Sequence, residues 1–387
     1  MTQNLIKTKE LLILLSSAVF TLATMYAPQP LLSAIQDSYP AYSDADIALF
    51  MTLVLCPLSI APLLYGIVLS LFSTKRILLF SVAILCVTSL GLYLVSNFSL
   101  IIFFRFIQGL VVPAMLPSLM AYLSMQYSGA ILQQVMANYI AATILGGLIG
   151  RICSGFITSI FHWQMPFLFL AIGLAILFIF LLHLPEHSEN TFKHFSLNEF
   201  NQIIHIKGVK RLLFIESSCF FVFIALATYL PFLLTHIDNN ISEGRIGLTY
   251  LGYGVGIFIA LKSRSIINLV GDSVKTMRLG IFIFGISLLL FLIPNITCIF
   301  LAMFLLCSGQ FLEHSINPGL INRICPYNKN TLNCLYVSFY YMGGALGSYF
   351  PGIIYEKFGW NIFIFFLSTV LLCSLIATYH LKKHTPK

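Results

Sequence analysis

Two stretches of the sequence decide the fold, and they are copies of each other. Residues 146–163 read GGLIGRICSGFITSIFHW, and residues 343–360 read GGALGSYFPGIIYEKFGW. The offset of 197 residues is about half of the 387-residue chain, and a repeat of that length indicates two similar halves. The identical positions are Gly146, Gly147, Gly150, Gly155, Ile157, Phe161 and Trp163 in the first copy, and Gly343, Gly344, Gly347, Gly352, Ile354, Phe358 and Trp360 in the second.

The sequence around the repeat is more apolar than that of any ordinary soluble protein. Hydrophobic residues make up 59% of the chain, and Asp, Glu, Lys and Arg together only 9%, against about 25% charged residues in a soluble domain. The mean hydropathy is +0.94. This composition excludes a soluble enzyme, a disordered tail and a nucleic-acid-binding module, and it predicts a protein embedded in the lipid bilayer. The apolar runs are continuous, so they predict helices rather than the alternating strands of a membrane β-barrel.

Twelve segments are long enough to cross a bilayer, which takes about 20 residues per helix. The longest connection between them lies near the middle of the chain and contains an amphipathic piece, Phe195–His205. We therefore predict an all-α membrane protein of two six-helix bundles, residues 1–184 and 211–387, joined by a cytoplasmic linker, 185–210. Six spans per half make the halves parallel repeats about an axis along the membrane normal. The expected spans are 10–34, 46–71, 77–95, 99–124, 132–160, 165–184, 211–236, 244–262, 277–294, 297–322, 331–357 and 360–381.

The basic residues predict the orientation, because loops rich in Lys and Arg stay in the cytoplasm. With the N-terminus inside, most of the 21 Lys and Arg residues fall in inside segments, whereas the outside loops hold acidic residues such as Asp44, Asp238 and Glu356. Both termini are therefore expected in the cytoplasm, with the chain spanning the cell's inner membrane. The net charge of +8 then reflects topology, and no nucleic-acid partner is expected.

The sequence does not indicate a cofactor. The nine Cys residues lie in apolar runs without a CxxC pair, and there is no GxxxxGK[ST] loop that would bind ATP. No convergent nucleophile and base, and no set of metal ligands, can be recognised. We therefore predict no cofactor, no metal site and no enzymatic activity.

Three segments carry a family resemblance. Arg105-Phe-Ile-Gln108-Gly109 in the fourth span matches an RxxQG motif, residues 66–76 stand where a GxxxDxxGRK motif lies between spans two and three, and the glycine-rich fifth span resembles an antiporter motif. The chain thus resembles the major facilitator superfamily over essentially its whole length, and residues 26–32 resemble the first helix of its bacterial efflux permeases. The resemblance implies two bundles that alternate access around a midplane site, proton-coupled export of a small organic molecule, and a monomer.

The loop between the second and third spans departs from that motif. Ser70 and Ser73 replace its acidic residue and its second glycine, so that Gly66 and the basic pair Lys75–Arg76 are what remains of a gating loop. In the family that carboxylate helps to latch the cytoplasmic gate. We therefore expect this chain to close the gate in a different way.

Glu313 and His314 are the leading candidates for proton coupling. They lie in the tenth span, and with Gln310 and Asn317 they form a polar stripe at the spacing of one helix face. A carboxyl group held away from water can exchange a proton near neutral pH, and His titrates there in any case. The alternative is a hydrogen-bonded packing pair. The resemblance gives Arg105 a part in proton or substrate coupling, and the alternative is a structural Arg that holds backbone carbonyls or extends outward to the membrane surface.

Other polar residues within the spans are candidates for a substrate cavity. Arg151 stands where antiporters have a proline, and it either contacts substrate or gate, or extends to the outer surface. Glu216 is expected to form an ion pair with Lys210 and Arg211 at the cytoplasmic edge, and the alternative is a coupling residue. The glycines at 146, 147, 150, 343, 344 and 347 are expected to pack helices. The cavity candidates are Tyr26, Gln29, Gln108, Asn138, Arg151, Gln310 and Asn317.

The function that fits best is secondary active transport of a small molecule with protons. The two Arg residues within spans suit an anionic substrate, while the many aromatic residues suit a hydrophobic amphiphile. Proton-driven uptake or export of an anionic metabolite or siderophore is therefore the alternative. A membrane-embedded enzyme and a transport-inactive sensor or channel of the same fold are the remaining possibilities.

Overall fold

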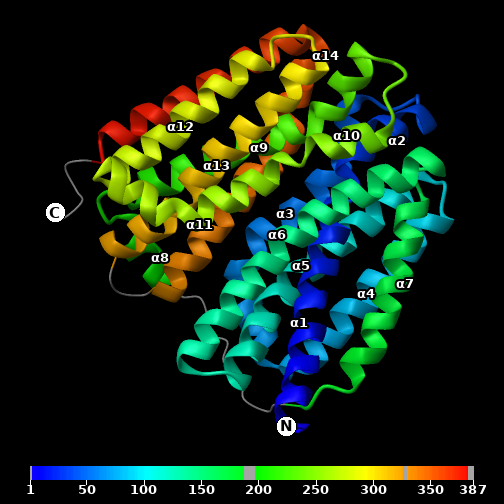
Figure 1. The fold of residues 1–387 in the computed structure, drawn as a ribbon, viewed down its shortest axis with the longest axis vertical. Helices are drawn as coiled ribbons and strands as arrows, with labels where there is room; N and C mark the ends of the chain where they lie inside the picture. Colours follow the sequence, from blue (N-terminus) through cyan, green and yellow to red (C-terminus); the bar gives the residue numbers. More distant parts are fainter. Residues whose placement is uncertain (1, 187–196, 326–328, 382–387) are drawn as a thin grey trace.

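The computed structural model describes residues 2–186, 197–325 and 329–381, and it is helical almost throughout (Figure 1). The helices of the first half are α1 (Thr2–Tyr26), the 3-10 helix η1 (Gln29–Leu31), α2 (Leu32–Ser38), α3 (Asp44–Ser70), α4 (Thr74–Leu94), α5 (Phe98–Gln126), α6 (Gly129–Ile160) and α7 (Met165–Leu182). Those of the second half are α8 (Leu197–Ile204), α9 (Val209–Ile237), α10 (Glu243–Thr249), α11 (Gly252–Val270), α12 (Ser273–Leu290), α13 (Ile296–Ile324) and α14 (Lys329–Tyr379).

The described residues contain 11 helical segments long and apolar enough to cross a membrane. The last of them is two helices in one. As a single rod its 51 residues would extend about 76 Å, more than twice the roughly 30 Å hydrocarbon core of a bilayer. Gly359 interrupts it with φ 78° and ψ 177°, a backbone conformation open to glycine. The chain turns there, which gives the twelve spans expected from the sequence.

Two of the expected spans are broken. The segment 10–34 bends after α1, because Pro28 and Pro30 lack the N–H that a continuous α-helix needs. The segment 244–262 divides into α10 and α11 at Tyr250, whose hydroxyl donates to the carbonyl oxygen of Ala227 at 2.7 Å and ties the break to α9. The amphipathic piece of the linker forms α8, while residues 187–196 of the linker lie outside the described residues.

The internal repeat has a structural counterpart in each half. Glycines of the first copy let α6 touch the backbone of α1, and the matching glycines of the second copy let α14 touch α9. A methyl group at these positions would come within 2.6–2.9 Å of a partner Cα atom, that of Val19 at Gly146, Ala23 at Gly150, Ser217 at Gly343 and Phe221 at Gly347. The next glycines along the chain instead face side chains: Gly147 faces Tyr26, and Gly344 faces Phe220.

The two bundles meet at one end of the molecule. The start of α1 and the end of α14 lie toward the opposite end, where the ribbons of the bundles diverge (Figure 1). We call these the contact end and the terminal end. Among the described residues, three hydrogen bonds cross between the bundles, and they join Thr52 to Ser348 (2.8 Å), the backbone N–H of Ala45 to Glu356 (2.7 Å), and Arg151 to Tyr253 (2.9 Å).

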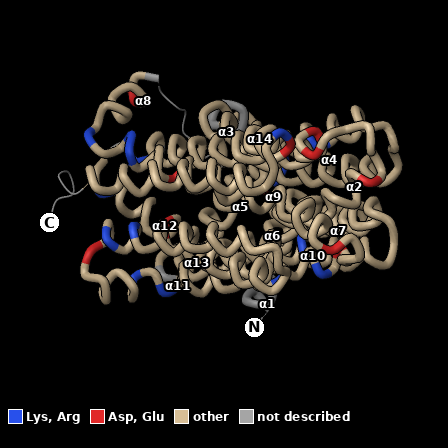
Figure 2. Tube along the Cα trace, turned by 90° about the horizontal axis from the view of Figure 1, so that it is seen from above, with Lys and Arg blue, Asp and Glu red and all other residues tan. Residues whose placement is uncertain are grey.

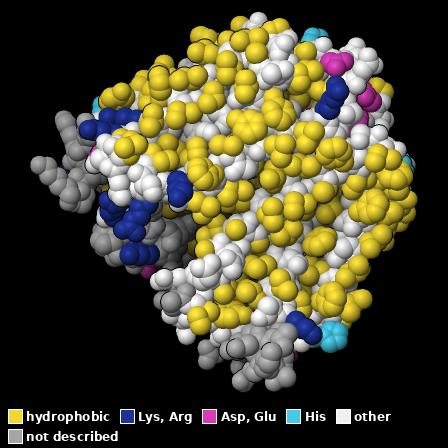
Figure 3. Space-filling model, viewed as in Figure 1, with side chains coloured by type: hydrophobic (Ala, Val, Ile, Leu, Met, Phe, Trp, Pro, Cys, Tyr) yellow, Lys and Arg dark blue, Asp and Glu magenta, His cyan; other side chains and the backbone are white. Residues whose placement is uncertain are grey.

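The surface fits a bilayer. Hydrophobic side chains cover most of the face drawn in Figure 3, and Lys and Arg side chains gather near its margins. Seen from above, most charged residues lie toward the ends of the helices and leave the middle of the molecule uncharged (Figure 2). The exceptions within the spans are therefore the first places to look for function.

Candidate functional site

A cluster of acidic and polar side chains lies inside the second bundle, between α9, α13 and α14. Glu216 of α9 is fully buried, and its Oε1 atom lies 2.5 Å from Nδ1 of His314 on α13. Among the described residues, neither Glu216 nor Glu313 has a Lys or Arg within ion-pair distance. A buried carboxylate without a cation is costly, so a proton is what can neutralise this cluster.

Glu313 occupies the same cluster one residue before His314. It is fully buried, and its Oε1 accepts a hydrogen bond from Nδ2 of Asn317 at 2.9 Å, one helical turn away. Asn317 Nδ2 also donates to the backbone carbonyl of Leu212 on α9, at 3.1 Å. The second carboxylate oxygens of Glu216 and Glu313 are buried without a hydrogen-bond partner. Each of these oxygens is free to carry a proton.

His314 connects this buried cluster to its surroundings. Its side chain is 34% exposed, whereas that of Glu216 is not exposed at all. The hydroxyl of Tyr336 on α14 lies 3.3 Å from its Nδ1, and the Tyr340 ring lies 4.8 Å from its ring, centroid to centroid. His314 is thus placed to exchange a proton with water and with Glu216.

The prediction for Glu216 was wrong. It does not pair with Lys210 or Arg211 at the edge of the membrane, and Arg211 donates instead to the carbonyl oxygen of His380, at 3.1 Å. Glu216 lies seven residues into α9, about 10 Å from its start, where the helix is buried on nearly all sides. Sequence proximity to two basic residues was misleading, because the carboxylate points across to α13.

Arg151 of α6 forms a second polar centre, at the junction of the bundles. It is fully buried rather than extended to the surface. Its guanidinium donates to Gln29 Oε1 at 2.7 Å, to the carbonyl oxygen of Gly147 at 2.7 Å, and to the Tyr253 hydroxyl of the other bundle at 2.9 Å. All three acceptors are neutral.

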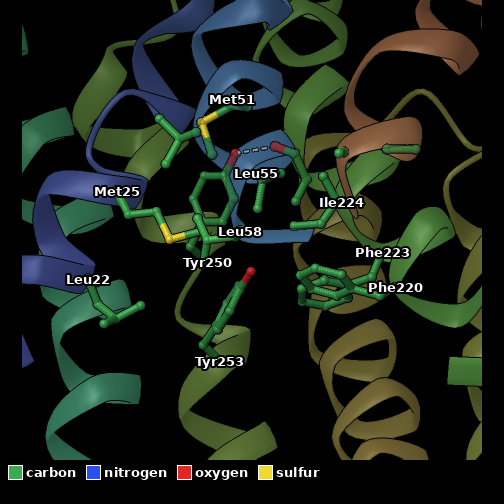
Figure 4. Packing of buried hydrophobic residues seen from close by; sticks show 14 of the residues in the cluster. Leu22, Met25, Met51, Leu55, Leu58, Phe220, Phe223, Ile224, Tyr250 and Tyr253 are labelled. Atoms are coloured by element: carbon green, nitrogen blue, oxygen red, sulfur yellow. Dashed lines mark hydrogen bonds between the residues drawn. The ribbon is translucent and has the colours of Figure 1, made fainter. Parts of the chain in front are cut away.

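Tyrosine rings surround the same guanidinium. Its central carbon lies 4.0 Å from the ring centre of Tyr26, 4.3 Å from that of Tyr253 and 5.4 Å from that of Tyr250. Figure 4 shows Tyr253 standing between the bundles, with Leu22 and Met25 of α1 on one side and the α9 phenylalanines on the other. The rings stabilise the cation through their π faces without neutralising its charge.

Arg105 of α5 is buried in the first bundle and bonds differently. Its guanidinium donates to the backbone carbonyls of Thr24 (3.1 Å), Met25 (2.9 Å) and Phe50 (2.8 Å), and to Gln108 Oε1 (2.6 Å). Two of these carbonyls lie just before the break at the end of α1. The geometry matches the structural alternative for Arg105, and its part in coupling stays a prediction.

The other predicted cavity residues are scattered. Gln310 is buried and neither of its amide atoms has a partner. Asn138 is half-buried and accepts a hydrogen bond from Gln134 within α6, at 3.2 Å. Gln108 accepts a hydrogen bond from Arg105 through Oε1, and its Nε2 donates to the hydroxyl of Ser89 at 3.2 Å.

Ser73 and Arg76 of the gating loop contact a carboxylate from another segment of the chain. Glu186, just after α7, accepts a hydrogen bond from the Ser73 hydroxyl at 2.8 Å and pairs with Arg76 at 3.1 Å. Lys75 donates to two carbonyl oxygens at the end of α7, at 2.8 and 2.5 Å. Gly66 lies within α3. The basic pair is therefore held by α7 of the same bundle.

Sequence reasoning missed Tyr250 and Tyr253, and it favoured the wrong partners for Glu216. Tyr250 and Tyr253 look like ordinary packing aromatics, and only the break between α10 and α11 turns both toward Arg151. Glu216 could have been found from its seven-residue distance to the start of an apolar helix, which is too deep for a surface ion pair.

Residues 11–326 match the sequence pattern of the Major Facilitator Superfamily. The chain belongs to this superfamily. Its relatives include the E. coli inner membrane transport protein YnfM, 24% identical over 94% of this chain and 88% of that protein. The uncharacterized MFS-type transporter YybF of Bacillus subtilis is 26% identical over 92% of this chain and 89% of its own.

Solved major facilitator structures share the fold. A bacterial homolog of the human lysosomal transporter Spinster, crystallised in an inward-facing and occupied conformation, gives a TM-score of 0.80 at 13% identity, over 98% of this chain and 97% of that chain. The nucleoside transporter NupG gives 0.79 at 14% identity, over 97% and 99%. As a member of this superfamily, the protein is a multi-pass membrane transporter.

Proposed function

We propose that this protein exports a small organic molecule across the inner membrane in exchange for protons, by alternating access of its two bundles. The observation that carries the proposal is the Glu216–His314 pair, with Glu313 beside it, because among the described residues neither buried carboxylate has a Lys or Arg within ion-pair distance. Titratable groups in a membrane span are costly, and they commonly mark proton pathways in transporters.

The orientation of the proposal rests on charge. Lys and Arg residues dominate the segments at the terminal end, which supports a cytoplasmic location for both termini. The contact end then faces outward, and the structure represents an inward-facing state, as in the Spinster homolog. His314 would exchange protons on the cytoplasmic side in this state, and on the outer side after the bundles rock over.

The cluster can work as a relay of one proton. A proton on His314 makes it the cation of an ion pair with Glu216, and its loss leaves a neutral ring beside a carboxylate that must itself bind a proton or find another partner. Glu313 can accept that proton, because its Oε2 atom has no hydrogen-bond partner among the described residues. The charge of the cluster therefore changes with proton occupancy, and the two bundle arrangements would differ in how well they tolerate each charge. Export rather than uptake follows from the resemblance of the first helix to efflux permeases.

Purified protein in liposomes tests the proposal. Flux of three probes that share one ring, benzenesulfonate, neutral benzenesulfonamide and phenyltrimethylammonium, is measured with and without an imposed pH gradient. We expect a gradient to drive at least one probe, and gradient-free exchange of that probe to be slower. Glu216→Gln and Glu313→Gln should lose gradient-driven flux and keep exchange, because exchange needs no net proton movement.

Ser315→Ala is the matched control, since Ser315 lies on the same helix and its hydroxyl bonds only locally, to the carbonyl oxygen of Leu312. It should transport as the unaltered protein does. Equal flux with and without the gradient in the unaltered protein would contradict proton coupling. Unchanged gradient-driven flux in both Gln variants would contradict the assignment of the cluster.

A second candidate function is transport of an organic anion, such as a carboxylate metabolite or a siderophore, in either direction. The buried guanidinium of Arg151 favours it, because its hydrogen-bond acceptors are neutral.

A further inference from the structure

We infer that Arg151 and Gln29 form the recognition site for an anionic group, and that the transported molecule is an organic anion with an aromatic or otherwise flat body. The inference rests on the proposed transport function and narrows its substrate class.

The guanidinium of Arg151 carries a buried positive charge. Arg151 is fully buried, and among the described residues no carboxylate lies within ion-pair distance of its guanidinium. A cation held away from water without a counter-ion is unfavourable. An anion that reached this point would remove that penalty, whereas a cationic molecule would add to it.

Gln29 is fully buried and accepts from Arg151 through Oε1, so its Nε2 faces elsewhere, and this Nε2 has no acceptor in the part of the chain that the structure describes. An unsatisfied buried donor carries its own penalty. The guanidinium and the spare amide are both donors, and the ligand group that satisfies two donors at once is an oxyanion such as a carboxylate or sulfonate.

The rings of Tyr26, Tyr253 and Tyr250 stand around the guanidinium at 4.0, 4.3 and 5.4 Å. Phe223, drawn beside Tyr253 in Figure 4, continues this aromatic wall with its ring centre 5.4 Å from that of Tyr253. The ring centre of Phe311 lies 5.7 Å from that of Tyr253. Such walls favour a flat or aromatic body behind the anionic group.

The bond from Arg151 to the Tyr253 hydroxyl crosses between the bundles. A bidentate oxyanion bonds through Nη2, the same nitrogen that donates to the Tyr253 hydroxyl, so the anion and the hydroxyl share one donor group. Occupancy of the site therefore weakens a contact that holds the contact end together, and the anion favours the state in which that end opens.

Binding to purified protein in detergent tests the inference without any proton gradient. The dissociation constants of benzenesulfonate, benzoate, benzenesulfonamide and phenyltrimethylammonium are measured by microscale thermophoresis. We expect both anions to bind at least tenfold more tightly than the neutral amide, and the cation more weakly still. Arg151→Gln should weaken the anions at least tenfold and leave the amide unchanged, while Gln29→Leu should have a smaller effect in the same direction.

Arg278→Gln is the control, because Arg278 also lies over a tyrosine ring, that of Tyr379 at 4.1 Å, and bonds to neutral acceptors, but at a remote position. It should bind the anions as the unaltered protein does. Arg151→Lys keeps the charge and should retain part of the affinity, which separates recognition from misfolding.

Equal affinities for the anions and the amide, or anion binding that survives Arg151→Gln, would overturn the inference. If anions bind through Arg151 but a pH gradient drives no probe, the proposed function is contradicted and this inference is not. If a pH gradient drives flux but the affinity for anions does not depend on Arg151, this inference is contradicted and the proposed function is not.

Discussion

Arg151 and Ser348 occupy equivalent positions of the two repeats, 197 residues apart, and each forms a hydrogen bond to the opposite bundle. Arg151 reaches Tyr253 near the start of α11, and Ser348 lies 2.8 Å, hydroxyl to hydroxyl, from Thr52 in α3. The contact end thus has an approximate twofold symmetry in its backbone. Its chemistry is asymmetric, since one side carries a charge and the other a hydroxyl.

Glu356 should latch the contact end. Its carboxylate accepts a hydrogen bond from the N–H of Ala45, in the first turn of α3 of the other bundle, at 2.7 Å. An anion at a helix N-terminus is stabilising by about 1 kcal/mol, which is roughly fivefold in population. Glu356→Gln should therefore expose the contact end more often. Labelling of a cysteine at position 348 by an impermeant maleimide, in a background without the native cysteines, should become about fivefold faster by the same estimate.

The control for this latch is Asp238→Asn, which removes an acidic group whose Oδ1 bonds locally, to the N–H of Asn240. It should leave the labelling rate unchanged. A Glu356→Gln protein that is labelled no faster than the control would show that the latch contributes nothing.

The glycines of the repeat should resist enlargement. A Cβ on Gly146 would stand 2.7 Å from the Cα of Val19, and neither backbone can yield without moving a helix. Gly146→Ala should destabilise the protein by about 1–3 kcal/mol, the usual cost of overpacking, and lower its thermal denaturation midpoint in detergent. Gly254→Ala in α11 is the matched control, since no atom lies within 4 Å of its added methyl group. Equal midpoints for the two variants would be incompatible with this packing.

Arg105 should affect stability and transport together. Arg105→Ala removes the side-chain donor to the carbonyls of Thr24, Met25 and Phe50, and a buried carbonyl that is left without any donor costs about 1–3 kcal/mol. We expect a lower denaturation midpoint and weaker probe flux at equal protein level in the membrane. Weaker flux with an unchanged midpoint would instead favour a direct part of Arg105 in coupling, and normal flux would contradict both.

Lys75 should contribute more to the stability of the protein than Arg76. The Arg76–Glu186 pair is largely exposed, at 71% and 48% of the two side chains, and exposed pairs are worth between 0 and about 1 kcal/mol. Lys75 instead satisfies two carbonyls at the end of α7. Thermal denaturation should show a larger loss for Lys75→Gln than for Arg76→Gln. The reverse order would indicate that the ion pair holds the loop.

Much of the fold could be predicted from the sequence, because a bilayer allows few solutions. The repeat and the apolar runs predict the spans and the halves, and Gly146 and Gly343 do pack against equivalent helices. The breaks at Pro28 and Tyr250 were not predicted, since each depends on contacts made by the folded neighbours as well as on local residues.

The candidate site could be predicted only in part. Polar residues in a span stand out, which is why Glu313, His314 and Arg151 were found. Their partners did not stand out, because Glu216 has basic neighbours in sequence and Tyr253 resembles packing. Which helices face each other, and in which register, is set by tertiary packing that one sequence does not display.

The position of Arg151 along α6 has a mechanical consequence. At 1.5 Å per residue, α6 extends about 14 Å from Arg151 to Ile160 at the contact end and about 33 Å to Gly129 at the terminal end. The glycine contacts hold α1 and α6 together as one unit, and the Arg151–Tyr253 bond is one of the points where this unit contacts the second bundle. If the unit tilts about this point, its long side sweeps more than twice the distance of its short side. A small movement of the short side at the contact end therefore becomes a movement more than twice as large at the terminal end.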